Sequence, residues 1–218
     1  MGYDHTLSGG HPVLDFVNSV DDWTVPVAQD YLQEFADAQR FAEAVGLISR
    51  REARLLESPP GSRGTAGERR ASRSNSAELA SLKRLRASLE RILRASLEKR
   101  ATAAEDVATL RQGLVEAARR TELLPEADGS LSRRITVESN GPSALRLRIV
   151  DSAMALLSSD AMRHVKACPT CGWFFLDVSK NQSRVWCSMD TCGAQAKARR
   201  YYRRTKGSRA KRPSSLRG

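Results

Sequence analysis

The sequence predicts a mainly α-helical fold with one small β-hairpin and a separate four-cysteine module near the C-terminus. Three observations predict it. Ala, Leu, Arg and Glu are abundant in the 218 residues, whereas aromatic residues make up only 6 %, and this mixture favours helices. Apolar residues recur at helical spacing in long stretches of the first 158 residues. All four cysteines lie in the last quarter of the chain.

Residues 1–57 combine a short apolar segment with two expected helices. The apolar residues of 13–20 predict a buried segment, and those of 31–45 recur at helical spacing up to Gly46, a natural helix end. Ser49 and Glu52 have the spacing of a capping box, which predicts the start of another helix.

Residues 58–76 are rich in Gly, Pro, Ser and Arg, a composition typical of a flexible linker or long loop. Their positive charge indicates either a second nucleic-acid contact or a solvated loop. We expect the solvated loop.

Residues 77–158 are expected to be mainly helical. One apolar stripe consists of Leu79, Leu82, Leu85, Leu89, Ile92, Leu93 and Leu97. It predicts a core-facing helix, with a dimer seam as the alternative, and a partner helix is expected to begin near Thr102.

Beyond Pro125 the pattern changes from helical spacing to alternation. Residues 134–138 and 145–149 alternate in polarity, and Asn140-Gly141 between them is a turn signal. We therefore expect a β-hairpin here, followed by a helix capped by Asp151.

The positive charge is concentrated at the C-terminal end. The chain carries a net charge of +11, and residues 160–218 hold 14 basic and three acidic residues, which accounts for all of it. A basic tail can serve solubility alone, but next to a cysteine cluster it points to a polyanionic partner.

The cysteines follow the pattern C-x2-C-x15-C-x4-C, formed by Cys168, Cys171, Cys187 and Cys192. Two close pairs at this separation are typical of one structural zinc ion held in a tetrahedron. The N-terminus lacks a signal-peptide pattern and no apolar run is long enough to span a bilayer, so we expect a cytoplasmic protein. In that compartment two disulfides or a thioredoxin-type redox pair are weaker alternatives.

The second cysteine pair leads into an expected helix that starts after Ser188, an arrangement typical of treble-clef-like zinc fingers. Thiolates at a helix N-terminus are stabilised by the helix dipole. The aromatic residues around the site are Trp173, Phe174, Phe175 and Trp186. We expect them to form a small core for the finger, with base stacking as the alternative.

The helix after the finger is the candidate nucleic-acid surface, because its basic side chains suit phosphate contacts and its polar ones base edges. The candidate residues are Arg184, Gln195, Lys197, Arg199, Arg200, Arg203 and Arg204. A merely solvated face is the alternative. Four cysteines close the zinc coordination sphere, and no catalytic motif is present, so we expect no enzyme activity.

Two segments resemble known families. The C-terminal segment resembles the CGNR zinc finger in Cys168-Pro-x-Cys171-Gly, Phe175-x-Asp177-x-Ser179, Arg184-x-Trp186-Cys187-Ser-Met189, Cys192-Gly193 and Lys197. Residues 10–19, GHPVLDFVNS, resemble the start of the ABATE domain of bacterial stress-induced transcription regulators. The resemblance implies a helical N-terminal domain and a DNA-binding finger. Ala194-Gln195 replaces the Asn-Arg of the name motif. If that Asn or Arg contacts nucleic acid, the contact is altered here, and Gln195 either bonds a base edge in its place or is only structural.

Together these observations predict an α-rich domain over 1–158, a zinc finger with a basic helix over 160–205 and a disordered basic tail over 206–218. DNA is the expected partner, with structured RNA or an acidic protein as alternatives, and no membrane. A homodimer is a further alternative for the assembly, with an effector ligand of unknown identity. His11, Asp15 and Asn18 either line a pocket or, as we expect, cap and hydrogen-bond a buried turn.

Overall fold

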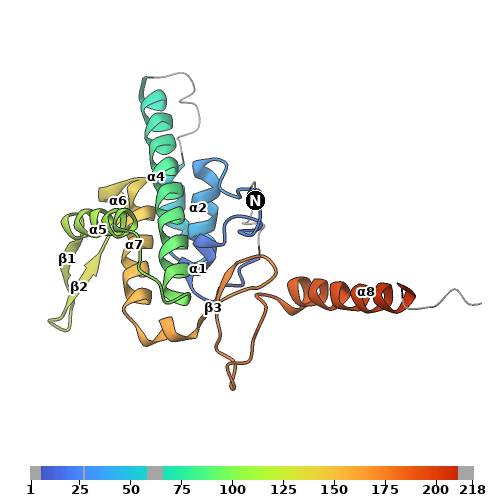
Figure 1. The fold of residues 1–218 in the computed structure, drawn as a ribbon. Helices are drawn as coiled ribbons and strands as arrows, with labels where there is room; N and C mark the ends of the chain where they lie inside the picture. Colours follow the sequence, from blue (N-terminus) through green and yellow to red (C-terminus); the bar gives the residue numbers. More distant parts are fainter. Residues whose placement is uncertain (1–5, 27, 58–65, 211–218) are drawn as a thin grey trace, which may run out of the picture.

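The computed structural model describes residues 6–26, 28–57 and 66–210. Its elements are α1 (Pro12–Val17), α2 (Phe35–Ala44), α3 (Arg50–Leu56), α4 (Ala66–Leu97), α5 (Ala104–Arg119), β1 (Glu122–Pro125), β2 (Leu131–Arg134), α6 (Val137–Asn140), α7 (Ser143–Leu157), the 3-10 helix η1 (Asp160–His164), β3 (Val165–Ala167), β4 (Phe174–Leu176), the π-helical turn η2 (Met189–Gly193) and α8 (Ala194–Ala210). Helices pack around α4 and α7, whereas α8 leads away from this body (Figure 1). The mainly helical fold class is therefore confirmed.

Helices α4 and α7 supply the centre of the core. The predicted stripe on α4 is confirmed, because Leu82, Leu85, Leu89, Ile92 and Leu93 are buried. Helix α5 packs against both α4 and α7. At Gly113 of α5 the contact is so close that an added Cβ atom would lie 2.8 Å from Val150 Cγ2.

The N-terminal segments cover one side of this core. The apolar segment predicted over 13–20 is buried and forms α1. The capping box of α3 is confirmed, since Ser49 N donates to Glu52 Oε2 at 2.8 Å and Glu52 N donates to Ser49 Oγ at 3.2 Å.

The β-hairpin is real, but the predicted strands were placed wrongly. Strands β1 and β2 pair antiparallel upstream of the predicted site, with Glu122 opposite Arg134 and Pro125 opposite Leu131. Residues 134–138 include the end of β2 and the start of α6, and residues 145–149 lie in α7. Gly141, expected in the hairpin turn, instead ends α6 with a φ of +55°.

Helix α7 was misread because it is buried on most of its surface. Its buried residues are Ala144, Leu145, Leu147, Ile149, Val150, Ala153 and Leu156. Arg146 and Arg148 interrupt this run and mimic alternation, yet both are paired inside the protein. Arg146 Nε lies 2.5 Å from Glu78 Oε1, and Arg148 pairs with Glu52. Asp151 lies within the helix instead of capping it.

Two predictions about irregular segments were partly wrong. Helix α4 begins at Ala66, so the part of the predicted linker from 66 to 76 is helical. The Pro residues lie upstream of it, and Ala, Arg and Glu are good helix formers. Residues 58–65 lie outside the described residues. Helix α8 continues to Ala210, so the predicted disordered tail is helical over 206–210, and 211–218 lie outside the described residues.

A second hairpin joins the cysteine region to the core. Strands β3 and β4 pair antiparallel, with Val165 opposite Leu176 and Ala167 opposite Phe174. Val165 and Phe174 belong to the main hydrophobic core. In the described parts of the chain, none of the helices has the length and apolarity needed to cross a membrane.

Candidate metal centre and basic helix

The first cysteine pair lies in a tight turn between β3 and β4. Gly172 N donates to the carbonyl of Cys168 at 2.9 Å, and Cys168 N donates to the carbonyl of Trp173 at 2.7 Å. Gly172 has a φ of +75°, a left-handed conformation that glycine adopts without strain. The turn directs both thiols, of Cys168 and Cys171, to the same side.

The four cysteine thiols meet in one buried cluster, and all four are free of disulfides. The sulfurs of Cys171, Cys187 and Cys192 lie 3.6 Å from one another, and all four ligand atoms lie within 4.8 Å. A tetrahedron with zinc–sulfur bonds of about 2.3 Å has sulfur–sulfur edges of about 3.8 Å. The cluster therefore fits one zinc ion. His164 is not part of this group.

The thiols also affect each other's protonation. Hydrogen bonds from the Cys171 and Cys187 thiols lower the pKa of Cys168. The same hydrogen bonds to Cys168 raise the pKa of Cys171 and of Cys187. The thiols therefore share protons within a buried site. A divalent cation bound there replaces these protons and favours the thiolate form of all four cysteines.

The second cysteine pair lies at the turn that starts α8. Ser188 caps η2 as predicted, because its hydroxyl accepts a hydrogen bond from Thr191 N at 3.3 Å. Cys187 immediately precedes this cap, and Cys192 lies within the turn. The turn continues directly into α8, so a metal ion bound by these cysteines holds the first turn of the basic helix.

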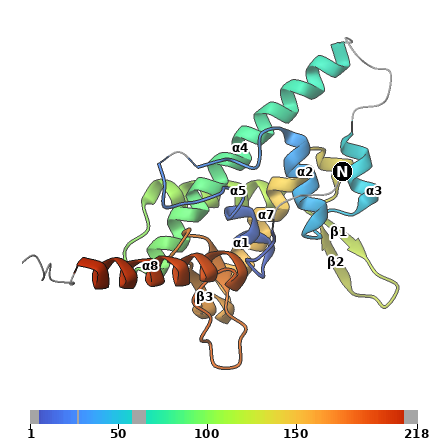
Figure 2. The same cartoon turned by 90° about the vertical axis from the view of Figure 1, so that its right-hand side faces the viewer.

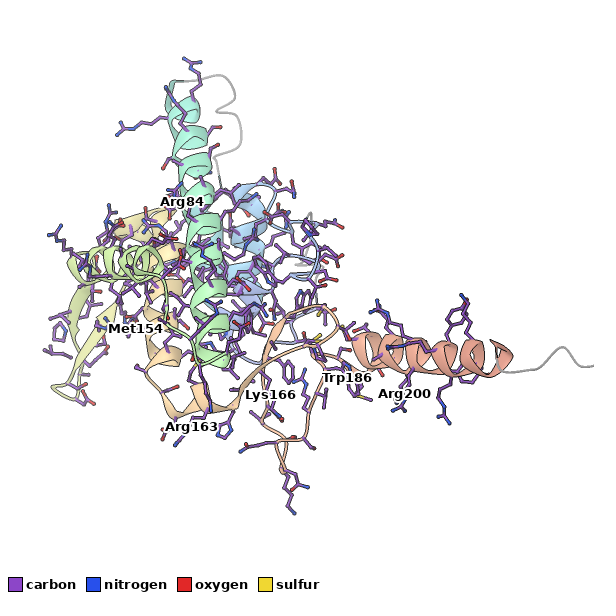
Figure 3. The ribbon with its side chains drawn as sticks, viewed as in Figure 1. Arg84, Met154, Arg163, Lys166, Trp186 and Arg200 are labelled. Carbon is purple, nitrogen blue, oxygen red and sulfur yellow. The ribbon has the colours of Figure 1, made fainter. Side chains whose placement is uncertain are left out.

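The expected aromatic core of the finger is correct in three of its four members. Phe175 is fully buried against the cysteines, and Trp173 and Trp186 pack beside them. Phe174 belongs to the main core instead, because neighbouring residues of β4 point to opposite faces. Figure 3 places Trp186 beside the start of α8.

Arg184 is used inside the finger. Its guanidinium lies 4.5 Å from the centroid of the Phe175 ring. It donates to the carbonyls of Trp186 at 3.0 Å and Ser8 at 3.2 Å, and also to that of Cys187. Through these contacts the side chain of Arg184 braces the second cysteine pair. Its nucleic-acid contact stays a prediction.

Asp177 organises the loop between the two cysteine pairs, a role that sequence reasoning missed. Its buried carboxylate accepts hydrogen bonds from Lys166 Nζ at 2.6 Å, the Ser179 hydroxyl at 2.6 Å and Arg184 N at 3.0 Å. The hydrogen bond from Lys166 is the main cause that holds the pKa of Asp177 far below its usual range. The Asp177-x-Ser179 spacing, noted above only as part of the family resemblance, was the available signal, since it is typical of a local side-chain turn.

The finger is docked on the N-terminal region by backbone hydrogen bonds. Trp23 N donates to the carbonyl of Cys171 at 2.9 Å, and Leu176 N donates to that of Gly9 at 2.7 Å. Trp173 Nε1 donates to the carbonyl of Val20 at 2.7 Å. The metal centre is thus attached on several sides to the segment around α1.

The polar residues of α1 hold this segment in shape. His11 caps the helix, because its Nδ1 accepts from Val13 N at 3.2 Å. Asp15 Oδ1 accepts from Gly9 N at 2.7 Å. Burial raises the pKa of Asp15, and the Gly9 hydrogen bond opposes this change. Asn18 bonds to the backbone of Phe174. These contacts match the predicted capping and hydrogen-bonding roles.

Helix α8 is exposed and contains the predicted basic residues. Its main packing partner is η2. Figure 1 shows α8 projecting from the body, and in Figure 2 its C-terminal end extends past the body. The side chains of Gln195, Lys197, Arg199, Arg200, Arg203 and Arg204 are all exposed. Figure 3 shows Arg200 on this helix, away from the body.

Two family models match the chain in consecutive segments. Residues 164–205 match the CGNR zinc finger. Residues 10–160 match the ABATE model, described as "Putative stress-induced transcription regulator". The chain belongs to the ABATE family. The order of the two matches in this ABATE protein confirms the resemblance found in its sequence, and no curated protein matches it.

The ABATE protein departs from the CGNR name motif at the start of α8. Ala194 and Gln195 follow Cys192-Gly193, and both are exposed in the first turn of the helix. Neither belongs to the cysteine cluster. The departure therefore changes the surface of the basic helix and leaves the metal ligands intact.

The ABATE region also contains an open cleft of about 690 Å³ between α3, β2, α6 and α7. Two ion pairs join charged side chains of its lining. Arg133 pairs with Asp151, and Arg148 pairs with Glu52 and donates to the carbonyl of Ile135 at 2.7 Å. Four of the charged side chains of this polar cleft are therefore already paired.

Proposed function

We propose that this zinc finger protein of the ABATE regulator family binds duplex DNA through α8 and acts as a cytoplasmic bacterial transcription regulator without enzyme activity. One observation carries the proposal. The exposed segment Ala194–Lys206 holds six basic residues and no acidic residue on an arm that projects from the body.

Helix α8 has the dimensions and charge that suit a DNA groove. Seventeen residues make a helix about 25 Å long, and an α-helix fits the major groove. Lys and Arg side chains along such a helix reach phosphates on the groove walls. Because phosphate contacts release counterions, binding of this type weakens steeply as salt increases.

The zinc ion has an indirect part in this function. The four cysteines that would hold it, Cys168, Cys171, Cys187 and Cys192, are buried and close the coordination sphere. Zinc bound there stabilises the turn that begins α8 and fixes the direction of the arm relative to the body. The ABATE region is then available for an effector or for a second copy of the chain.

The test is fluorescence anisotropy of a labelled random-sequence duplex, titrated with zinc-loaded full-length protein at several salt concentrations. We expect micromolar binding and a log–log salt slope of about −4 to −6, which corresponds to roughly four to seven phosphate contacts. The variant Lys197→Gln/Arg199→Gln/Arg204→Gln should make the slope less negative by about 2–3.

The matched control, Arg84→Gln/Arg111→Gln/Arg119→Gln, removes the same charge from exposed positions on α4 and α5. Its slope should equal that of the unmodified protein. If the slope became equally less negative in both variants, the change would reflect only the net charge of the protein. No binding at low salt would contradict DNA binding and favour docking to an acidic protein, and stronger competition by structured RNA than by duplex DNA would favour an RNA partner.

A further inference from the structure

Helix α8 exposes two adjacent tyrosines as well as its charges. Tyr201 is 71 % exposed and Tyr202 is 60 % exposed. Large aromatic side chains usually bury most of their surface. Two of them on a projecting helix therefore indicate a surface that acquires a partner.

The tyrosines lie on an uncharged face of α8. At about 100° per residue, residues 194, 198, 201, 202 and 205 fall within an arc of about 100°, and Gln195 lies at its edge. These positions are Ala, Ala, Tyr, Tyr and Thr. The six basic residues all lie outside this arc.

The basic residues border the uncharged face on both sides. Lys197 and Arg204 follow one edge of the face, and Arg199 and Lys206 follow the other. Arg200 and Arg203 point away from it, at about 140–160° from its centre. The helix thus has a neutral strip between two rows of positive charge.

This pattern argues against a second copy of α8 as the occupant. Two such helices would bring their positive rows together, and like charges across an interface are unfavourable. The strip also holds only two large side chains, far fewer than the 20–30 residues a side of a stable interface.

A DNA major groove fits a neutral strip that lies between two rows of positive charge. Its floor offers base edges and thymine methyl groups, and a phosphate backbone runs along each wall. Gln can bond an adenine edge in a bidentate manner, and small apolar side chains contact thymine methyl groups. Tyr adds an apolar ring and a hydroxyl that can donate or accept.

We propose that the uncharged face of α8 reads base edges in the DNA major groove through Gln195, Ala198, Tyr201 and Tyr202. Lys197 and Arg204 contact the phosphates of one wall, and Arg199 and Lys206 contact those of the other. Arg200 and Arg203 face away from the DNA. This inference rests on the proposed function and adds which face of the helix carries sequence preference.

The test begins with selection of preferred sites from a random duplex library by the zinc-loaded full-length protein. Affinities for the selected and a scrambled duplex are then measured by anisotropy. We expect Gln195→Ala, Tyr201→Ala and Tyr202→Ala each to reduce the preference for the selected duplex by roughly 5–150-fold. Their salt slopes should stay unchanged, because no phosphate contact is removed.

The control variant is Arg200→Gln/Arg203→Gln, which should keep the preference and change the salt slope by less than about one. Alanine favours helices, so the tyrosine variants should retain α8, and zinc content with circular dichroism checks the fold of each. Loss of affinity in the arginine variant with full preference in the tyrosine variants would overturn the inference, since the basic face would then meet the DNA.

Two other outcomes separate the inference from the proposed function. If the protein binds duplex DNA but selects no preferred sequence, the inference that the uncharged face of α8 reads base edges is overturned, and the proposed DNA binding stands. No duplex binding at any salt concentration would overturn both.

Discussion

The side-chain amide of Asn18 pairs with the backbone of Phe174 in both directions: Nδ2 donates to the carbonyl at 2.8 Å, and Oδ1 accepts from the amide at 2.9 Å. Asn18 ends α1, and Phe174 lies two residues after Gly172, in the strand that follows the first cysteine pair. The contact therefore joins the start of the ABATE region to the finger, although the two residues are 156 positions apart.

Substitution of Asn18 should weaken both parts of the molecule. Asn18→Ala leaves the amide and carbonyl of Phe174 unpaired in a buried site, which costs about 2–4 kcal/mol of unfolding free energy. Chemical denaturation of the zinc-loaded protein measures this loss. Asn181→Ala, at an exposed position of the finger loop, should change the free energy by less than about 0.5 kcal/mol. Equal stability of the two variants would contradict a joining role for Asn18.

Loss of one metal ligand should destabilise α1 as well as the finger. Cys192→Ser removes one thiolate of the cluster, so zinc content should fall well below one ion per chain. Because Phe174 packs in the main core, amide hydrogen exchange should also speed up in α1. The neighbouring exposed substitution Thr191→Ala should change neither. Unchanged protection of α1 in Cys192→Ser would show that finger and helical region fold independently.

The ion pair between Glu52 and Arg148 predicts a pH dependence of stability. The hydrogen bond from Arg148 is the main cause that lowers the pKa of Glu52 from 4.5 to about 2. A carboxyl whose folded pKa is lowered contributes stability above its unfolded pKa, and that contribution is lost as pH falls from about 4.5 to about 2. Allowing for solvent screening, Glu52→Gln should cost on the order of 1–2 kcal/mol at pH 6.

The difference between the unmodified protein and Glu52→Gln should shrink at pH 3, as measured by denaturation at both pH values. Each comparison is made at one pH, so loss of zinc in acid affects both proteins alike. Glu57→Gln, an exposed change one residue after α3, serves as the control. A difference that is constant between pH 6 and pH 3 would contradict the assigned role of Arg148.

Conservative replacement of Arg184 distinguishes a bracing role from a phosphate contact. Arg184→Lys keeps the charge but loses the planar guanidinium that bonds the carbonyls of Trp186, Cys187 and Ser8. We expect faster zinc release to a colorimetric chelator and an unchanged salt slope for any duplex binding. Lys180→Ala, on the exposed part of the same loop, should not alter zinc release. A changed salt slope with normal zinc release would support the nucleic-acid role of Arg184.

Local patterns in the sequence predicted much of the fold and of the site. The apolar stripe on α4 was predictable because a helix with one buried face repeats its apolar residues every three or four positions. The four cysteines were predictable because close pairs in turns bring thiols together through local geometry alone. Ser188 as the cap of the turn before α8 followed from the same kind of local rule.

Helix α7 was not predictable from local patterns. A helix buried on most sides has no polar face, so its sequence carries no helical period, and two internally paired arginines made it alternate like a strand. The hairpin was misplaced for this reason.

The sequence by itself determined the helical fold class, the cysteine cluster and the location of the positive charge, because each depends on residues close together in the chain. Only the tertiary structure decided that Asn18 bonds Phe174, that Arg184 braces the second cysteine pair and that α8 stands free. These features depend on which distant segments meet and on which donors and acceptors remain unpaired once they do, and no local spacing records that.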